Sequence, residues 1–153
     1  MMLWKKSQKN DLEIRRATPA DARGIINCMQ SVMDEKVYLV SEYYLLTERG
    51  EQERLKNPDE LTLICLNGSM VIGVLTLQRG LYKNRHTANL GIAIRSGYRH
   101  MKIGTRLILE ALKWAKKEGI KKVNLEVFST NVNAIKAYRK IGFEYEGVRK
   151  ISL

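Results

Sequence analysis

Three side chains suited to proton transfer and anchoring follow one another near the carboxyl end of the sequence. Glu126 lies in an alternating run of apolar residues, Asn131 stands where a helix is expected to begin, and Tyr138 comes two turns into that helix. A carboxylate, an amide and a phenol are the groups that an acyl transfer to an amine needs as base, anchor and acid. Their spacing along one strand and one helix predicts that they share a cleft.

Each of these residues also has a purely structural interpretation. Tyr138 recurs at helical spacing with Ala134, Ile135 and Ile141, as a tyrosine packed in a core would, and spacing alone favours that reading. Glu126 is equally compatible with a half-exposed strand carboxylate that pairs with a lysine. Asn131 is a preferred helix cap as well as a potential hydrogen-bonding side chain.

The first half of the sequence predicts a strand, two helices and a hairpin. Residues 12–17 alternate like a strand, and Thr18-Pro-Ala-Asp21 then predicts a helix that starts near Pro19. Residues 43–55 read as a second helix. Apolar runs at 61–66 and 70–77 flank Asn67-Gly68, which is a strong hairpin signal.

The second half predicts alternating strands and helices. Residues 86–94 form a strand in which Gly91 marks a bulge or a place of close backbone approach. An apolar helical face over residues 107–115 ends at Gly119, and a strand follows at 123–127. A helix from about Asn131 to Gly142 and a last strand at 143–149 complete a mixed α/β sheet covered on both faces.

Composition limits the class of protein. The chain has 153 residues, enough for a single domain over 1–153. Cys28 and Cys65 lie in apolar runs without metal-ligand spacing, so we expect buried thiols, no metal site and a cytoplasmic protein. The sequence has neither a signal peptide nor an apolar segment long enough for a membrane span.

The formal charge of +11 is unevenly distributed. Residues 95–122 carry nine basic and two acidic side chains, whereas residues 34–60 carry four basic and eight acidic ones. A basic segment suits a nucleotide or a nucleic acid, and an acidic segment suits a protonated amine. Most of the individual lysines are nevertheless typical of solvated helix surfaces.

Two motifs resemble those of the GNAT family, the Gcn5-related N-acetyltransferases. The segment Tyr98-Arg-His-Met-Lys-Ile-Gly-Thr105 is similar to the family's pyrophosphate loop, Q/R-x-x-G-x-G/A. The segment Asn131-x-x-Ala-Ile-x-x-Tyr138-x-x-x-Gly-Phe143 matches more closely. With Leu-Glu-Val at 125–127 it looks most like the bacterial enzymes that acetylate the N-terminal alanine of a ribosomal protein, and it is also similar to small amino-acid and antibiotic-amine acetyltransferases.

This resemblance runs from Leu12 to Val148 and implies a fold and a cofactor. The fold class would be α/β, with a mixed central sheet of about six strands, in the order 1-2-3-4-5 followed by a C-terminal strand, and about four flanking helices. Acetyl-CoA would be the co-substrate, Tyr138 the acid that protonates the CoA thiolate, and Glu126 the base that deprotonates the amine. The implied cofactor-binding residues are Ile92, Ala93, Ile94, Arg99, His100, Met101, Lys102, Ile103, Gly104, Thr105 and Asn131.

Lys102 departs from the family pattern, which usually has a glycine there. Either its side chain points outward and adds a cation, which we favour, or the loop is distorted and binds the cofactor weakly. Glu42, in the acidic segment, is a candidate for holding the substrate ammonium, although a solvated charge is the simpler interpretation.

The predicted activity is transfer of an acetyl group to a primary amine, which could belong to an N-terminal peptide, an amino acid, a polyamine or an antibiotic. The alternatives are a basic nucleic-acid-binding module, which lacks any matching motif here, and a CoA-binding protein without catalysis. The family usually adds one more strand beside that of Glu126. We expect it to be missing from this sequence, which would leave one strand edge open, to be covered by a partner subunit, as in a homodimer, or by residues outside this sequence.

Overall fold

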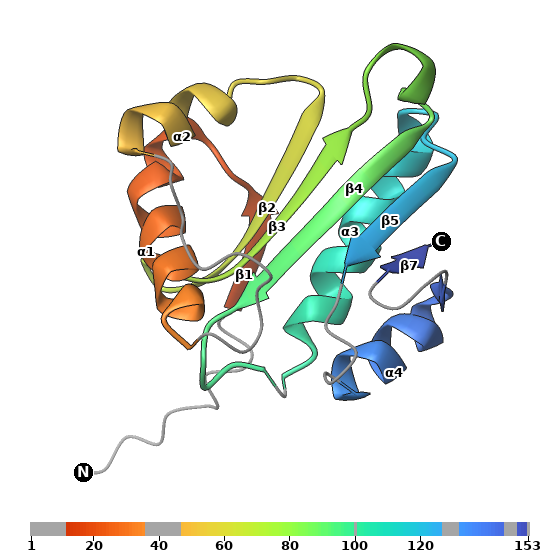
Figure 1. The fold of residues 1–153 in the computed structure, drawn as a ribbon. Helices are drawn as coiled ribbons and strands as arrows, with labels where there is room; N and C mark the ends of the chain where they lie inside the picture. The colour runs from red at the N-terminus through yellow and green to blue at the C-terminus, as the bar shows by residue number, and fades with distance from the viewer. Residues whose placement is uncertain (1–11, 36–46, 100, 127–131, 146–149, 153) are drawn as a thin grey trace, which may run out of the picture.

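In the computed structural model, residues 12–35, 47–99, 101–126, 132–145 and 150–152 are described (Figure 1). Their strands form one sheet in the order β1-β2-β3-β4-β5-β7-β6. The helices and strands are β1 (Leu12–Arg16), the 3-10 turn η2 (Pro19–Asp21), α1 (Ala22–Met33), α2 (Glu48–Arg54), β2 (Glu60–Asn67), β3 (Met70–Arg79), η3 (Tyr82–Asn84), β4 (Thr87–Ile94), α3 (Ile103–Lys117), β5 (Lys122–Glu126), α4 (Val132–Ile141), β6 (Glu144–Tyr145) and β7 (Lys150–Ser152). The predicted mixed α/β sheet is confirmed.

The predicted hairpin joins β2 to β3. Asn67 pairs with Met70, so Gly68 and Ser69 form a two-residue connection. Gly68 has a φ of 61°, a conformation that suits the first central position of a tight hairpin turn and that glycine adopts without steric cost. β4 and β5 are parallel and are linked by α3, while the other described neighbours in the sheet are antiparallel.

The start of the first helical segment follows the predicted capping pattern. The Asp21 carboxylate accepts a hydrogen bond of 2.8 Å from the Thr18 N–H, with Pro19 at the first position. Both carboxylate oxygens of Asp21 also bind the Arg15 guanidinium at 2.8 Å. One aspartate therefore fixes the beginning of the helical segment and ties it to β1.

Helices cover both faces of the sheet, with α1 and α2 on one face and α3 and α4 on the other (Figure 1). On the α3 side, Leu107, Ile108 and Ala111 are fully buried against apolar residues of β2, β3, β4 and β5. On the α1 side, Ile25 and Cys28 pack with Ile64 and Val74. Along the described residues, no helix is both long and apolar enough to cross a bilayer.

One expectation about the strands is wrong, and for Gly91 the structure selects one of the two predicted alternatives. β7 is present beside β5, where Leu125 pairs with Ile151 and Glu126 with Lys150, so the expected open edge at β5 is covered within the chain. β4 contains no bulge at Gly91, because its register with β3 runs without interruption from Ala88 to Ile94. A Cβ at Gly91 would come within 3.1 Å of the Thr76 hydroxyl oxygen, so the glycine serves close approach instead.

Candidate functional site

Among the described residues, the pairing of the parallel strands β4 and β5 ends before β4 does. β4 pairs with β3 as far as Ile94, but it pairs with β5 only as far as Leu90, which lies opposite Leu125. Residues 91–94 therefore have no partner on their second side among the described strands. Backbone N–H and C=O groups that open toward such a gap can bind an extended ligand as a further strand would.

The loop that follows β4 is held at three points. The Arg95 N–H donates to the Ile72 carbonyl oxygen at 2.8 Å, and its side-chain Nε donates to Val71 at 3.3 Å. The Tyr98 hydroxyl accepts a hydrogen bond of 2.9 Å from the Asn67 amide at the β2–β3 hairpin. These contacts fix the path of the chain from the open part of β4 to the beginning of α3.

Arg99 is the third residue that holds the loop, through an ion pair with Glu35 at the end of α1. Both guanidinium nitrogens of Arg99 donate to Glu35, at 2.7 and 2.5 Å. This bidentate contact is a strong form of charge-assisted hydrogen bond, and it lowers the pKa of the Glu35 carboxyl. Glu35 was not singled out by the sequence, because 64 residues separate it from Arg99 and no local pattern connects them.

The start of α3 has the geometry of an anion site. Lys102 precedes the helix in the left-handed conformation, with φ 59° and ψ 23°. Its side chain is exposed, which agrees with the alternative in which the lysine points outward from the loop. The first helical hydrogen bond joins the Arg106 N–H to the Lys102 carbonyl oxygen at 3.2 Å. The amides of Ile103, Gly104 and Thr105 thus precede the helical ladder, at the positive end of the helix dipole.

Gly104 brings this helix start close to β4. A Cβ added at Gly104 would lie 3.6 Å from the Ile92 Cδ1 atom, within ordinary van der Waals contact. The amides at the start of α3 and the β4 segment around Ile92 are therefore neighbours, although they come from different elements.

Tyr138 lies on the same side of the sheet as α3. Its half-buried ring packs against the apolar cluster that contains Ile103 and Leu107, and it meets the Phe143 ring edge to face at 6.2 Å between centroids. Burial raises the pKa of Tyr138 to about 12, so the phenol stays protonated throughout the neutral range and is a hydrogen-bond donor. The structural role in packing and a role as proton donor coexist in this position.

The other predicted site residues fall into two groups. Ile92, Ile94 and Met101 contact the same apolar cluster as Tyr138, while Ala93 is buried in β4 and Glu126 is the last residue of β5, where the two strands separate. Glu42, His100 and Asn131 lie outside the described residues. The structure thus brings the strand, loop and tyrosine predictions together around one region.

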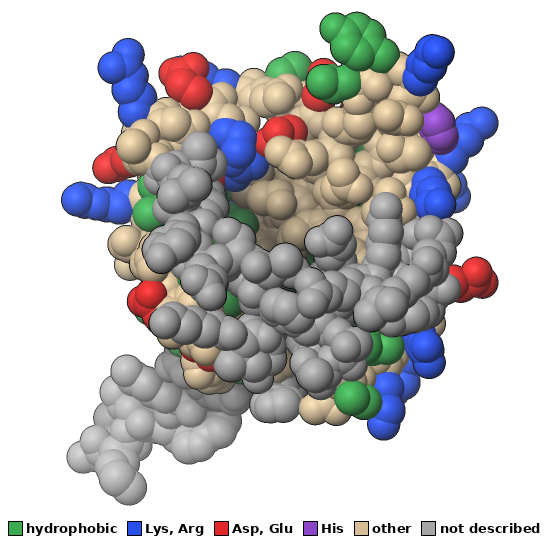
Figure 2. Space-filling model, in the orientation of Figure 1, with side chains coloured by type: hydrophobic (Ala, Val, Ile, Leu, Met, Phe, Trp, Pro, Cys, Tyr) green, Lys and Arg blue, Asp and Glu red, His purple; other side chains and the backbone are tan. Residues whose placement is uncertain are grey.

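A hollow lies over the middle of the sheet on the face that carries α1 and α2 (Figure 2). Asn89 and Asn124 meet near this face, with 3.5 Å between the Asn124 Nδ2 and the Asn89 Oδ1 atoms.

Across the described part of the chain, no three His, Cys, Asp or Glu side chains gather in a way that could hold a metal ion.

Comparison with known proteins identifies the family. The family model described as "Acetyltransferase (GNAT) family" matches residues 26–143. The chain belongs to the GNAT family. The resemblance inferred from the two motifs is confirmed, and so is the GNAT fold.

Individual relatives are more distant. The L-amino acid N-acetyltransferase AaaT of Escherichia coli K12 is 34% identical over 106 residues. That alignment covers 65% of this chain and 63% of the relative, just under two thirds of each.

Two solved structures illustrate the shared fold. An acetyltransferase of the GNAT family from Streptococcus pneumoniae is 25% identical, with a TM-score of 0.86 over 93% of this chain and 98% of that one. The PaiA N-acetyltransferase of Thermoplasma acidophilum, solved in complex with coenzyme A, is 26% identical, with a TM-score of 0.73 over 92% and 96% of the two chains.

Proposed function

We propose that this GNAT protein is an N-acetyltransferase that moves an acetyl group from acetyl-CoA directly onto a primary amine. The observation that carries the proposal is the adjacency of two features, the side of residues 91–94 that has no partner among the described strands and the start of α3 beside Ile92. The first offers hydrogen bonds to an extended amide-containing arm, and the second offers amides to a diphosphate. Acetyl-CoA contains both groups.

In this proposal different residues of the chain bind different parts of the cofactor. The backbones of residues 100–105 bind the pyrophosphate, with Lys102 contributing an exposed positive charge at the rim. Ile92, Ala93 and Ile94 bind the pantetheine arm in the manner of a neighbouring strand, and Asn131 adds a side-chain hydrogen bond. When bound, acetyl-CoA supplies the activated acetyl group. The protein positions the thioester toward the amine and transfers protons from the amine and to the leaving thiolate.

Arg99 would affect cofactor binding partly by holding the pyrophosphate loop in place. Its guanidinium is engaged by Glu35, so part of its positive charge is neutralised inside the protein. We infer that Arg99 holds the loop to α1 as well as facing the diphosphate.

Tyr138 is the proposed proton donor to the departing thiolate. Its raised pKa, about 12, keeps the phenol protonated at neutral pH but makes it a weaker acid than an exposed tyrosine. Proton transfer then requires the sulfur to be held against the phenol, so the role depends on positioning.

Glu126 is the proposed base for the incoming ammonium, whose pKa of about 10 means that it must lose a proton before it attacks. Its place at the end of β5, where β4 and β5 separate, supports this role. Glu42 is retained as a candidate for binding the acceptor ammonium.

The acceptor is proposed to be a small-molecule primary amine. The naming of the E. coli relative as an L-amino acid N-acetyltransferase makes free amino acids the first compounds to test. Polyamines, aminoglycosides and N-terminal peptides follow, since the family resemblance leaves all of them open.

The experiment is thiol release from acetyl-CoA over that panel of amines, with wild-type protein and with Tyr138→Phe. We expect turnover with at least one amine, and a fall in kcat of about tenfold or more in the variant with little change in acceptor KM. Phenylalanine keeps the contact with Phe143, so unchanged turnover would assign Tyr138 to packing alone.

A thermal shift distinguishes the remaining alternatives. Stabilisation by acetyl-CoA without turnover of any amine would indicate a CoA-binding protein that lacks catalysis. Stabilisation only by a DNA or RNA oligonucleotide at moderate salt would reject the enzyme in favour of a nucleic-acid-binding module.

A further inference from the structure

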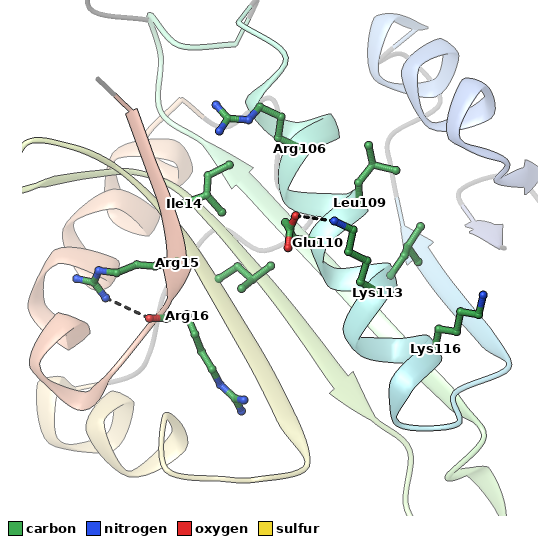
Figure 3. Close-up of a pocket in the computed structure, with 10 residues that line it drawn as sticks. Ile14, Arg15, Arg16, Arg106, Leu109, Glu110, Lys113 and Lys116 are labelled. Carbon is green, nitrogen blue, oxygen red and sulfur yellow. Dashed lines mark hydrogen bonds and ion pairs between the residues drawn. The ribbon is translucent and has the colours of Figure 1, made fainter. Parts of the chain in front are cut away.

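An open groove of about 810 Å³ lies between β1 and α3, away from the separation of β4 and β5 (Figure 3). Ile14 and Arg16 of β1 and Leu63 of β2 form one side and the floor, and α3 forms the other wall. The α3 residues that line it are Arg106, Leu109, Glu110, Leu112, Lys113 and Lys116.

The groove exists because two helices do not cover this face of the sheet. Seven described strands, at about 4.8 Å each, make a sheet about 30 Å wide. α3 packs over β2, β3 and β4, and α4 packs beside it, so the pair covers about 20 Å. The remaining strip beside β1 is about as wide as one more helix.

The floor of the groove is apolar where a surface should be polar. Leu63 is buried, Ile14 is half-buried, and Leu112 is half-buried on α3. Leu109 is 47% exposed, although it lies one position from the fully buried Ile108. An amphipathic helix that lay in the strip would cover these side chains with its own apolar face.

The rim of the groove is positively charged. Arg16 lies toward one end and Arg106 toward the other, with Lys113 and Lys116 along α3 (Figure 3). The acidic lining residue Glu110 is bound to Lys113, with 3.2 Å between the Nζ and Oε1 atoms.

Arg15 does not add to this charge, since its side chain points away from α3 (Figure 3), and its guanidinium binds the Asp21 carboxylate. The residues that line the groove therefore include four further basic side chains and one acidic side chain, which is paired with Lys113.

We propose that this groove binds an acidic amphipathic helix of a partner protein. Leucine-like side chains of the helix would contact Leu109 and Ile14, and its carboxylates would face Arg16, Lys113 and Lys116. The chain's own first residues are a poor match, because residues 1–11 contain three lysines and one aspartate and would repel the rim.

The proposal does not depend on the acetyltransferase site. The groove lies on the β1 side of α3, whereas the cofactor is proposed to bind at the start of α3 beside Ile92 on β4. Arg106 is close to that start, so it is left unchanged in the test.

The probe is a fluorescein-labelled peptide of about 18 residues, with leucines at helical spacing and glutamates elsewhere. Anisotropy is measured on the full chain at low and at moderate salt. The controls are a scrambled peptide of the same composition, which has no apolar face, a peptide with lysine in place of glutamate, and a DNA duplex.

The groove variants are K113E/K116E and Leu109→Ser. The matched control K83E/K121E also reverses two exposed charges, outside the groove. We expect salt-dependent binding that K113E/K116E weakens about tenfold and Leu109→Ser about threefold, while K83E/K121E is unchanged. Acetyl transfer should be unchanged in all three variants, which also reports that they are folded.

Four results would overturn the proposal: equal binding of the scrambled peptide, an equal loss of binding in K83E/K121E, tighter binding of the DNA duplex at the same residues, or self-association in sedimentation that the groove variants abolish. The first two would indicate general charge attraction, the third a nucleic-acid surface, and the last a second copy of this chain as the occupant.

Discussion

Lys102 occupies a backbone conformation that favours glycine, and this makes Lys102→Gly a quantitative test of the loop. A left-handed conformation costs a residue with a side chain about 1–2 kcal/mol, and glycine avoids that cost. Glycine also gains freedom in the unfolded chain, which offsets about 0.4–1 kcal/mol of the benefit. The net stabilisation should be about 0.5–1 kcal/mol, or a rise in Tm of about 1–4 °C for a chain of this length.

The same substitution has a smaller, opposite effect on cofactor affinity. Lys102 is exposed, so its charge contributes at most about 1 kcal/mol to binding a diphosphate. Removing it should weaken acetyl-CoA binding by about two- to fivefold, and less at high salt. A gain of more than about tenfold, equivalent to about 1.4 kcal/mol, would mean instead that the lysine side chain obstructs the loop.

Thermal unfolding and calorimetric titration with acetyl-CoA measure the two effects separately. Lys102→Ala is the matched control, because it removes the charge and keeps a side chain at the strained position. We expect it to lose affinity as Lys102→Gly does, without the rise in Tm. Equal Tm values for the two variants would refute the left-handed geometry on which the reasoning depends.

Three further substitutions test other contacts. Glu35→Gln removes the ion pair that holds the loop to α1, so acetyl-CoA affinity should fall about two- to fivefold; an unchanged or higher affinity would show that the pair does not position the loop. Asp21 has a pKa lowered from 3.8 to about 2, chiefly by the hydrogen bond from Arg15, so its contribution to stability is complete above about pH 4 and is lost as the pH falls toward 2. Urea unfolding of Asp21→Asn should therefore differ from wild type at pH 6 and converge with it near pH 2, and a constant difference would contradict this linkage. Leu107→Ala, at a fully buried position of α3, should cost about 3–5 kcal/mol in the free energy of unfolding, whereas Leu109→Ala on the exposed side should cost less than about 1 kcal/mol. Similar losses in the two variants would place the core on a different face of the helix.

Local signals in the sequence were sufficient for most of the fold. The Asn67-Gly68 hairpin, the capping residues Thr18 and Asp21, and the terminating Gly119 were all predicted, because each depends on residues within a few positions of one another. The buried Cys28 and Cys65 were predicted from the apolar runs around them.

What the sequence did not reveal depends on distant pairing. β7 has only three residues and is defined by its neighbours β5 and β6, so no periodicity marks it. The Arg99–Glu35 ion pair and the groove beside β1 arise only when α1, α3 and the sheet are assembled.

For the site, Ile92, Ile94, Met101 and Tyr138 contact one apolar cluster, whereas Glu42, His100 and Asn131 lie outside the described residues. The proton-transfer roles of Tyr138 and Glu126 and the binding roles of the cofactor residues stay predictions. They require a bound ligand or a measured rate.

The position of β7 has a consequence for biosynthesis. This strand is made after β5 and β6, yet it is inserted between them, so the order of strands in space differs from the order of translation. The antiparallel part from β1 to β4 can pair as it leaves the ribosome, since its neighbours are consecutive along the chain. The part of the sheet formed by β5, β7 and β6 cannot pair until residues 150–152 have left the ribosome. A nascent chain stalled before that point should therefore be cleaved readily by a protease at β5.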